Sequence, residues 1–229
     1  MTFDPSPPAA APGAARLTRS QKAEATRARI FDAAIEVVGE VGYADCSVSR
    51  ITAAAEVGQG TFYNYFDSRQ DLLEELLPSI SHTLLEHIRQ KMQSVADCPL
   101  ARERARIDGF FEFLAEKPHL FKLLHEGEFH ARKGFQRHIE MQSSSYLGAL
   151  QYEARRGNLR AELTGDLETV TRMLMASRDY ISGHYCVRDG AIVQPPRHVI
   201  DTYMEFTARG LFRDEVLRSA ASRHGAQVG

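Results

Sequence analysis

The sequence predicts an all-α fold, and three observations lead to this prediction. Apolar residues recur every three or four positions, the period of an amphipathic helix, in the segments that follow Thr18. Residues that favour helix ends, among them Ser, Thr, Asp, Gly and Pro, stand between these segments. Runs of alternating polar and apolar residues, the pattern of a half-buried strand, do not follow. We therefore expect a small N-terminal helical head joined to a larger helical domain.

The composition sets limits on function. The chain has 229 residues, of which 43% are hydrophobic and 25% charged, which is typical of a globular protein. A net charge of −2 argues against binding nucleic acid through bulk charge, so such binding needs a local patch. The chain has neither an apolar run of about 18 residues nor a signal-like N-terminus, so we expect a cytoplasmic protein without membrane association. The three cysteines are widely spaced and fit free thiols.

The N-terminal region combines an expected arm with a first helix. Residues 1–17 are rich in Pro and Ala, and we expect them to form a disordered arm. Thr18 and Gln21 have the spacing of a capping box, and helical apolar spacing continues from there until Gly42. The first helix is therefore expected to begin after Thr18 and to stop near Gly42.

Two short helices and the start of a longer one follow. Ser47 can cap a second helix that ends before Gly58. In the next stretch, VGQGTFYNYF, the residues Phe62 and Phe66 are four apart and share one helical face. Ser68 then caps a fourth helix with leucines at 72, 73, 76 and 77. Two short helices joined by a turn that contains glycine form a helix-turn-helix pattern, which we place in residues 18–68.

Basic residues gather at the start of the first helix. Between Arg16 and Arg29 there are five of them against the single acid Glu24. Between Phe31 and Ser68 the balance is reversed, with Arg50 as the one basic residue. Contacts to phosphate in that region would therefore have to come from hydroxyls and backbone N–H groups.

The larger domain is expected to span residues 69–218 and to be followed by a flexible tail, 219–229. Helical spacing covers residues 79–95, 101–116, 118–125, 128–156, 166–187 and 196–212. Gly157 follows two arginines and fits a C-terminal cap, while Asp166 and Pro196 fit helix starts. The stretch VRDGAIVQPP is expected to be a loop between the last two helices.

Several motifs between Ala28 and Leu73 carry a resemblance to a known family. They are the first-helix pattern ending in GY at 42–43, the Val and Ile at 48 and 51, and the block GTFYNYF followed by Ser, Arg and Leu at 68, 69 and 72. This stretch resembles the DNA-binding region of the tetracycline-repressor (TetR) family of bacterial transcription regulators. It departs from the family at Glu56, where glycine is usual, and at Gly58, where a capping serine is common.

The resemblance implies roles for individual residues in binding double-stranded DNA. It places four residues in the major groove: Gln59, Thr61, Tyr63 and Asn64. Gln59 and Asn64 are the better base readers, because a carboxamide can pair with adenine through both polar atoms. Gly60 lets the helix approach the duplex closely. The resemblance gives phosphate-facing positions to Ser47, Ser49, Tyr65 and Arg69.

For the larger domain the resemblance implies dimerisation and effector binding. The expected homodimer interface uses the apolar spacing of Ile200, Tyr203, Thr207 and Leu211. The segment 110–135 holds more aromatic residues than a short helical hairpin needs, so a cavity between helices is a reasonable expectation. The residues expected to line this effector pocket are Phe110, Phe113, Phe121, Phe129, Met173 and Tyr180.

Two polar motifs leave alternatives open. In HEGEFH, the spacing of His125 and His130 does not put both on one helical face, which argues against a metal site. In ARERAR, residues Arg102, Arg104 and Arg106 form either a solvated face or a site for an anionic effector head such as a coenzyme A phosphate.

Together these features predict a ligand-responsive transcription regulator, a repressor that a mostly apolar small molecule releases from a palindromic operator. The effector could be an acyl chain or an acyl-coenzyme A, and no cofactor is expected. The alternatives are a DNA-binding module without an effector and a small helical enzyme. Against an enzyme, the sequence has no nucleophile elbow, phosphate loop or metal-binding motif.

Overall fold

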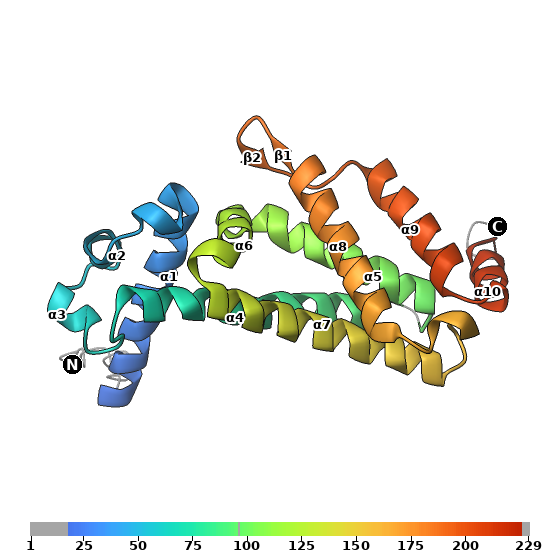
Figure 1. Ribbon diagram of the computed structural model, residues 1–229, viewed down its shortest axis with the longest axis horizontal. Coiled ribbons are helices and arrows are strands. Elements are labelled where there is room, and N and C mark those ends of the chain that lie inside the picture. Colours follow the sequence, from blue (N-terminus) through green and yellow to red (C-terminus); the bar gives the residue numbers. More distant parts are fainter. Residues whose placement is uncertain (1–17, 96, 226–229) are drawn as a thin grey trace, which may run out of the picture.

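The computed structural model describes residues 18–95 and 97–225, and in that part of the chain it is helical apart from one small hairpin (Figure 1). The prediction of an all-α fold is confirmed. The expected arm, residues 1–17, lies outside the described residues. No helix in the described ranges is long and apolar enough to span a membrane.

The head consists of α1 (Arg19–Asp45), α2 (Val48–Ala54) and α3 (Gln59–Phe62). Thr18 and Gln21 form the predicted capping box at the start of α1. At Gly42 the backbone leaves the helical conformation, with φ at +83°, before a last turn reaches Asp45. The buried side of the head is made by apolar residues of all three helices, including Ile30, Val38, Ile51 and Phe62.

Helix α4 (Arg69–Gln93) leaves the head and continues without interruption into the larger domain. The expected break near residue 78 is wrong, because Pro78 lies inside this helix. Proline has no N–H and so leaves the carbonyl of Glu74 without its helical donor. Arg137 supplies a donor instead, with its Nη2 2.8 Å from the Glu74 oxygen. Gly134 permits this close approach, since a side chain there would collide with the Glu74 backbone.

The larger domain is built from α4 to α10. Helices α5 (Pro99–Glu116) and α7 (Arg132–Arg155) pack against α4, and α8 (Leu167–Tyr185) crosses α7. Helix α6 (His119–His130) packs against α1, and α9 (Arg197–Leu211) packs against α5. The expected break between residues 125 and 128 lies instead at Ala131. Gly127 remains helical inside α6, where it is buried against the side chain of Leu77.

Two further expectations for the C-terminal region need correction. The expected loop after α8 contains a short hairpin, β1 (Val187–Arg188) paired with β2 (Ala191–Ile192). Its turn residues Asp189 and Gly190 both have positive φ, as a two-residue hairpin turn requires. The tail expected from residue 219 is helical up to Gly225, in α10 (Asp214–Gly225). A single-turn 3-10 helix, η1 (Ala161–Leu163), completes the elements.

Candidate DNA interface and ligand cavities

The first part of the candidate interface is the start of α2. The hydroxyl of Ser47 caps this helix by accepting a hydrogen bond from the N–H of Arg50 at 3.3 Å. The hydroxyl of Ser49 lies 2.9 Å from that of Ser47. Two hydroxyls therefore lie at a helix N-terminus, where free N–H groups favour an anion.

A tight turn connects α2 to α3. Glu56 lies in the left-handed region with φ at +52°, and the N–H of Val57 returns to the carbonyl of Thr52 at 3.0 Å. Gly58 begins α3 without a side-chain cap. Glu56 thus occupies a conformation that glycine would adopt without strain. The left-handed conformation of a glutamate costs about 1 kcal/mol of folding free energy.

Helix α3 and the turn after it, residues 63–66, together have the two sides that the spacing predicts. Phe62 and Phe66 are buried, with 0% and 3% of their surfaces exposed. Tyr63, by contrast, is 56% exposed. The predicted base-reading residues Gln59 and Asn64 are exposed together with Gly60, whereas Thr61 and Tyr65 are half-buried. These polar side chains are held on the outside of a rigid core.

Arg69 does not have the free side chain that a phosphate contact needs. Its Nε donates to the carbonyl of Cys46, and its Nη2 donates to the carbonyl of Tyr43. Both acceptors lie at the end of α1, where helical carbonyls lack intrahelical partners. Arg69 thus ties the start of α4 to the end of α1, and these contacts argue against the expected phosphate role.

The basic segment at the start of α1 extends beyond the core of the head. Ile30 is the first buried residue of this helix, so nearly three turns precede it. Arg19, Lys22 and Arg29 are exposed in this stretch, while Arg27 pairs with Glu75 on α4. Arg16 lies outside the described residues. The segment carries positive charge at the same end of the molecule as α3 (Figure 1).

A set of contacts, here called the head latch, joins the head to α6. The carboxylate of Glu126 accepts the N–H of Tyr43 at 2.9 Å, directly after the bend at Gly42. The ring of Tyr43 stacks on His130 at 6.0 Å between centroids. Gln70 donates to the carbonyl of His130 at 2.8 Å. A movement of α6 would therefore displace the end of α1 through these contacts.

The six residues expected to line one effector pocket are not brought together. Phe110 and Phe113 are buried, and Phe121 is half-buried. Phe110 and Phe113 border different hollows, because only Phe110 faces α8 and Phe113 lies near α1. The other three are on the outside, with 80% of Phe129, 64% of Met173 and 75% of Tyr180 exposed. The expectation of a single pocket from these residues is wrong, because ring density alone does not indicate which way each ring points.

The structure has instead an inner cavity of about 170 Å³ between α5, α6, α7 and α8. Phe110 lies on one wall and Arg178 on another, with the guanidinium 4.0 Å from the ring centre. His138 is tied to the hydroxyl of Ser81 through Nδ1 at 2.6 Å. Burial, together with the charge of Arg178, lowers the pKa of His138 to about 4, so its ring is neutral near pH 7. The remaining lining residues are Leu124, His125, Glu128, Phe135, Ile139, Asp179 and Ser182.

Sequence reasoning missed Arg178, and it also missed Glu126 in the head latch. Burial of an isolated arginine in a helix carries no local sequence signal. The two histidines of HEGEFH are separated as expected, with His125 stacked on Phe121 and His130 on Tyr43. In the described residues, no group of three potential metal ligands comes together.

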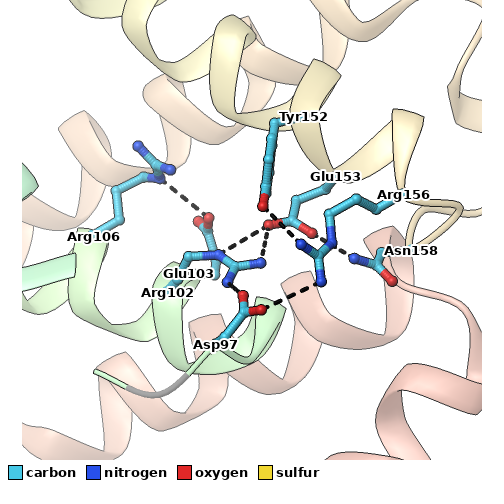
Figure 2. Close-up of polar contacts among 8 residues, drawn as sticks. All are labelled: Asp97, Arg102, Glu103, Arg106, Tyr152, Glu153, Arg156 and Asn158. Carbon is cyan, nitrogen blue, oxygen red and sulfur yellow. Dashed lines mark hydrogen bonds and ion pairs between the residues drawn. The ribbon is translucent and has the colours of Figure 1, made fainter. Parts of the chain in front are cut away.

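A second hollow, the distal groove, lies between α4, α5 and α7 near the end that is far from the head. Its volume is about 490 Å³, and Leu85, Ile88, Met92, Arg89, Arg102 and Arg106 are among its lining residues. Figure 2 shows that Arg102 and Arg106 of α5 point at acids. Arg102 lies between Asp97 and Glu153, and the Nε of Arg106 lies 3.3 Å from Glu103.

Arg104, the third arginine of ARERAR, is also paired, with Asp108 at 2.9 Å and Asp201 at 2.7 Å. Each guanidinium of the motif thus already has a carboxylate partner. An anionic effector head would have to compete with these acids, so the contacts favour a structural role for the three arginines.

The outer faces of α8 and α9 differ from the expected dimer interface. Ile200, Tyr203, Thr207 and Leu211 are each at most 7% exposed, because this face of α9 packs against α5 of the same chain. Their assignment to a subunit interface is corrected. The exposed apolar residues on these two helices are Met173, Tyr180 and Phe206, the last with 77% of its surface exposed.

Comparison with known proteins assigns the head. Residues 30–76 match the family of bacterial regulatory proteins named tetR. The head of this chain therefore resembles that of the tetR family. Among curated relatives, the HTH-type transcriptional regulator BetI of Ectopseudomonas mendocina is 32% identical over 87 residues, which are 38% of this chain and 44% of the relative. The fatty acid metabolism regulator protein of Bacillus subtilis is 35% identical over 68 residues, 30% of this chain and 35% of the relative.

The chain thus matches less than half of the length of these curated relatives. Solved structures extend the likeness of fold to most of the chain. FadR from Bacillus halodurans has a TM-score of 0.68 at 22% identity, covering 82% of this chain and 97% of that one. FadR from Bacillus subtilis, solved in complex with stearoyl-CoA, has a TM-score of 0.64 at 20% identity, covering 80% and 98%.

Proposed function

We propose that this protein is a tetR-family transcription regulator that binds a palindromic operator as a homodimer. The observation that carries the proposal is the polar outer side of α3 and of the turn after it, where Gln59, Tyr63 and Asn64 are exposed while Phe62 and Phe66 are buried. Such a helix can enter a major groove, and carboxamides can read adenine.

Phosphate contacts in this proposal come from two sources. The hydroxyls of Ser47 and Ser49 at the start of α2 hold one strand. The exposed Arg19 and Lys22 of α1 provide the local positive charge that the net charge of −2 conceals. These contacts fix the register of the head on the duplex and carry no sequence preference.

The dimer forms through the outer faces of α8 and α9. Met173, Tyr180 and Phe206 are large apolar side chains that a partner subunit would remove from water. Two-fold pairing gives two heads, which accounts for a palindromic site with half-sites on the order of 10 base pairs or more apart.

The protein is a repressor in this proposal, and a mostly apolar small molecule releases it from DNA. The cavities of the larger domain and the head latch support such a response. Because one relative is a fatty acid metabolism regulator and one structural neighbour holds stearoyl-CoA, acyl chains and acyl-coenzyme A esters are suitable first ligands to test.

Selection from a random duplex library tests the DNA-binding part. The purified protein should enrich a palindrome, and Asn64→Ala should blur one base position in each half-site. A comparison variant is Asn158→Ala, which changes the same residue type in the larger domain, where Asn158 donates to Glu153. Enrichment of asymmetric or single-stranded sequences alone would contradict the proposal.

A further inference from the structure

The inner cavity contains a buried positive charge that the protein compensates weakly. The side chain of Arg178 is 10% exposed. Among the described residues its ion pair is with the neighbouring Asp179, whose Oδ1 lies 3.3 Å from Nη2 and 3.4 Å from Nε. Charge-assisted hydrogen bonds are usually 2.7–2.9 Å long, so these contacts are weak. Asp179 is also 53% exposed, and water screens its charge.

The orientation of Arg178 leaves donors available. The ring of Phe110 covers one face of the guanidinium at 4.0 Å. Guanidinium N–H groups lie in the plane of the group and not along this stacking direction, so stacking does not use them. A planar bidentate acceptor, such as a carboxylate, matches the geometry of two N–H groups at the edge of the guanidinium plane.

The size and lining of the inner cavity limit the rest of the ligand. A cavity of about 150 Å³ can hold benzene, and this one has about 170 Å³. Leu124, Phe135 and Ile139 supply apolar walls in addition to Phe110. A six-membered ring or a short branched chain fits this space. An acyl-coenzyme A does not, so among the hollows described above such a ligand would need the larger distal groove.

We infer that the inner cavity binds a small carboxylate with an apolar ring or branched chain, and that Arg178 pairs with the carboxylate group. The positive charge of Arg178 disfavours a cationic ligand of the same size. The acids Glu128 and Asp179 lie at exposed positions, where solvent weakens their repulsion of an anion.

The position of α6 connects this cavity to the head. Leu124 and His125 line the cavity, and Glu126, the next residue, holds the N–H of Tyr43 in the head latch. A carboxylate that displaces α6 would therefore alter the end of α1 and the placement of the head. This step, in which the carboxylate acts as the effector, rests on the proposed DNA-binding function.

Isothermal titration of the full chain with three probes of equal size tests the binding claim. Benzoate should bind, while neutral benzamide should bind about 10- to 100-fold more weakly, because a hydrogen bond to a charged group contributes about 1.5–3 kcal/mol. Cationic benzylamine should not bind. Equal affinities for all three probes, or preference for benzylamine, would overturn the inference without any mutation.

Two variants then locate the site. Arg178→Gln should weaken benzoate binding about 10- to 100-fold and bring it to the level of benzamide. Arg172→Gln, on the exposed face of the same helix, is the matched control and should leave the affinity unchanged. If Arg178→Gln does not fold, Arg178→Lys keeps the charge but loses the bidentate geometry and should bind with intermediate affinity. Benzoate binding that is insensitive to both changes at Arg178 would place the site elsewhere.

Binding of the selected operator separates this inference from the proposed function. If the protein binds the operator but does not bind benzoate, the carboxylate site alone is overturned. A protein that binds benzoate through Arg178 but recognises no duplex would overturn the proposed function and leave the carboxylate site standing.

Discussion

Replacing Arg69 by alanine should destabilise the protein and leave the salt dependence of DNA binding nearly unchanged. The side chain makes two charge-assisted hydrogen bonds to carbonyls at the end of α1. Bonds of this kind contribute about 1.5–3 kcal/mol each when buried, but Arg69 is only partly buried, so we expect a total loss of about 2 kcal/mol. For a chain of this length, that loss lowers the melting temperature by about 4–8 °C.

The matched control is Lys22→Ala, in the exposed basic segment of α1. This change should leave the melting temperature unchanged and should reduce the slope of log K against log salt by about 1.8 for a dimer, since each phosphate contact contributes about 0.9. Melting is followed by circular dichroism at one protein concentration, because dimer stability depends on concentration. A normal melting temperature for Arg69→Ala together with a reduced salt slope would refute the capping role.

Four further changes test other parts of the account. Glu56→Gly should raise the free energy of unfolding by about 0.5–1 kcal/mol by relieving left-handed strain, and a lower value in urea titration would contradict the strain. Glu126→Ala should lower it by about 1–3 kcal/mol through loss of the bond to the Tyr43 N–H, and an unchanged urea midpoint would argue against the head latch. Phe206→Glu should give a folded monomer in sedimentation, whereas a persistent dimer would move the interface. Because the folded-state pKa of His138 is about 4, below its unfolded value of about 6.5, stability is full above pH 6.5 and falls as the pH drops towards 4. The loss between pH 7 and pH 5 should be about 2 kcal/mol, and His138→Gln should remove that part of the pH dependence.

The sequence predicted the features that depend on neighbouring residues. Spacings of three or four residues predicted the caps at Thr18 and Ser68 and the burial of Phe62 and Phe66. The glycine at residue 157 marked a helix end, where its φ is positive. These signals are local, because one helical turn contains both the capping side chain and the group that it satisfies. The two short helices α2 and α3 could therefore be expected from the sequence.

The errors arose where a partner far along the chain decides the outcome. Pro78 does not end a helix, since Arg137 supplies the missing donor to the carbonyl of Glu74. Gly127 does not break one either, and it lies inside α6 against the side chain of Leu77. Spacing alone indicated an apolar face on α9 but could not decide whether that face packs within the chain or against a second subunit. The cavity at Arg178 depends in the same way on four helices that meet only in the folded chain.

Hydroxyl-radical footprinting of the selected operator tests the central claim most directly. Two protein subunits on one duplex should protect two patches of backbone related by two-fold symmetry, with centres on the order of 10 base pairs or more apart. The Asn64→Ala variant should protect the same two patches on that duplex. It should also bind duplexes in which one base in each patch is changed. A single unpaired patch, or protection that is the same on every sequence, would contradict the account of a dimeric, sequence-reading regulator.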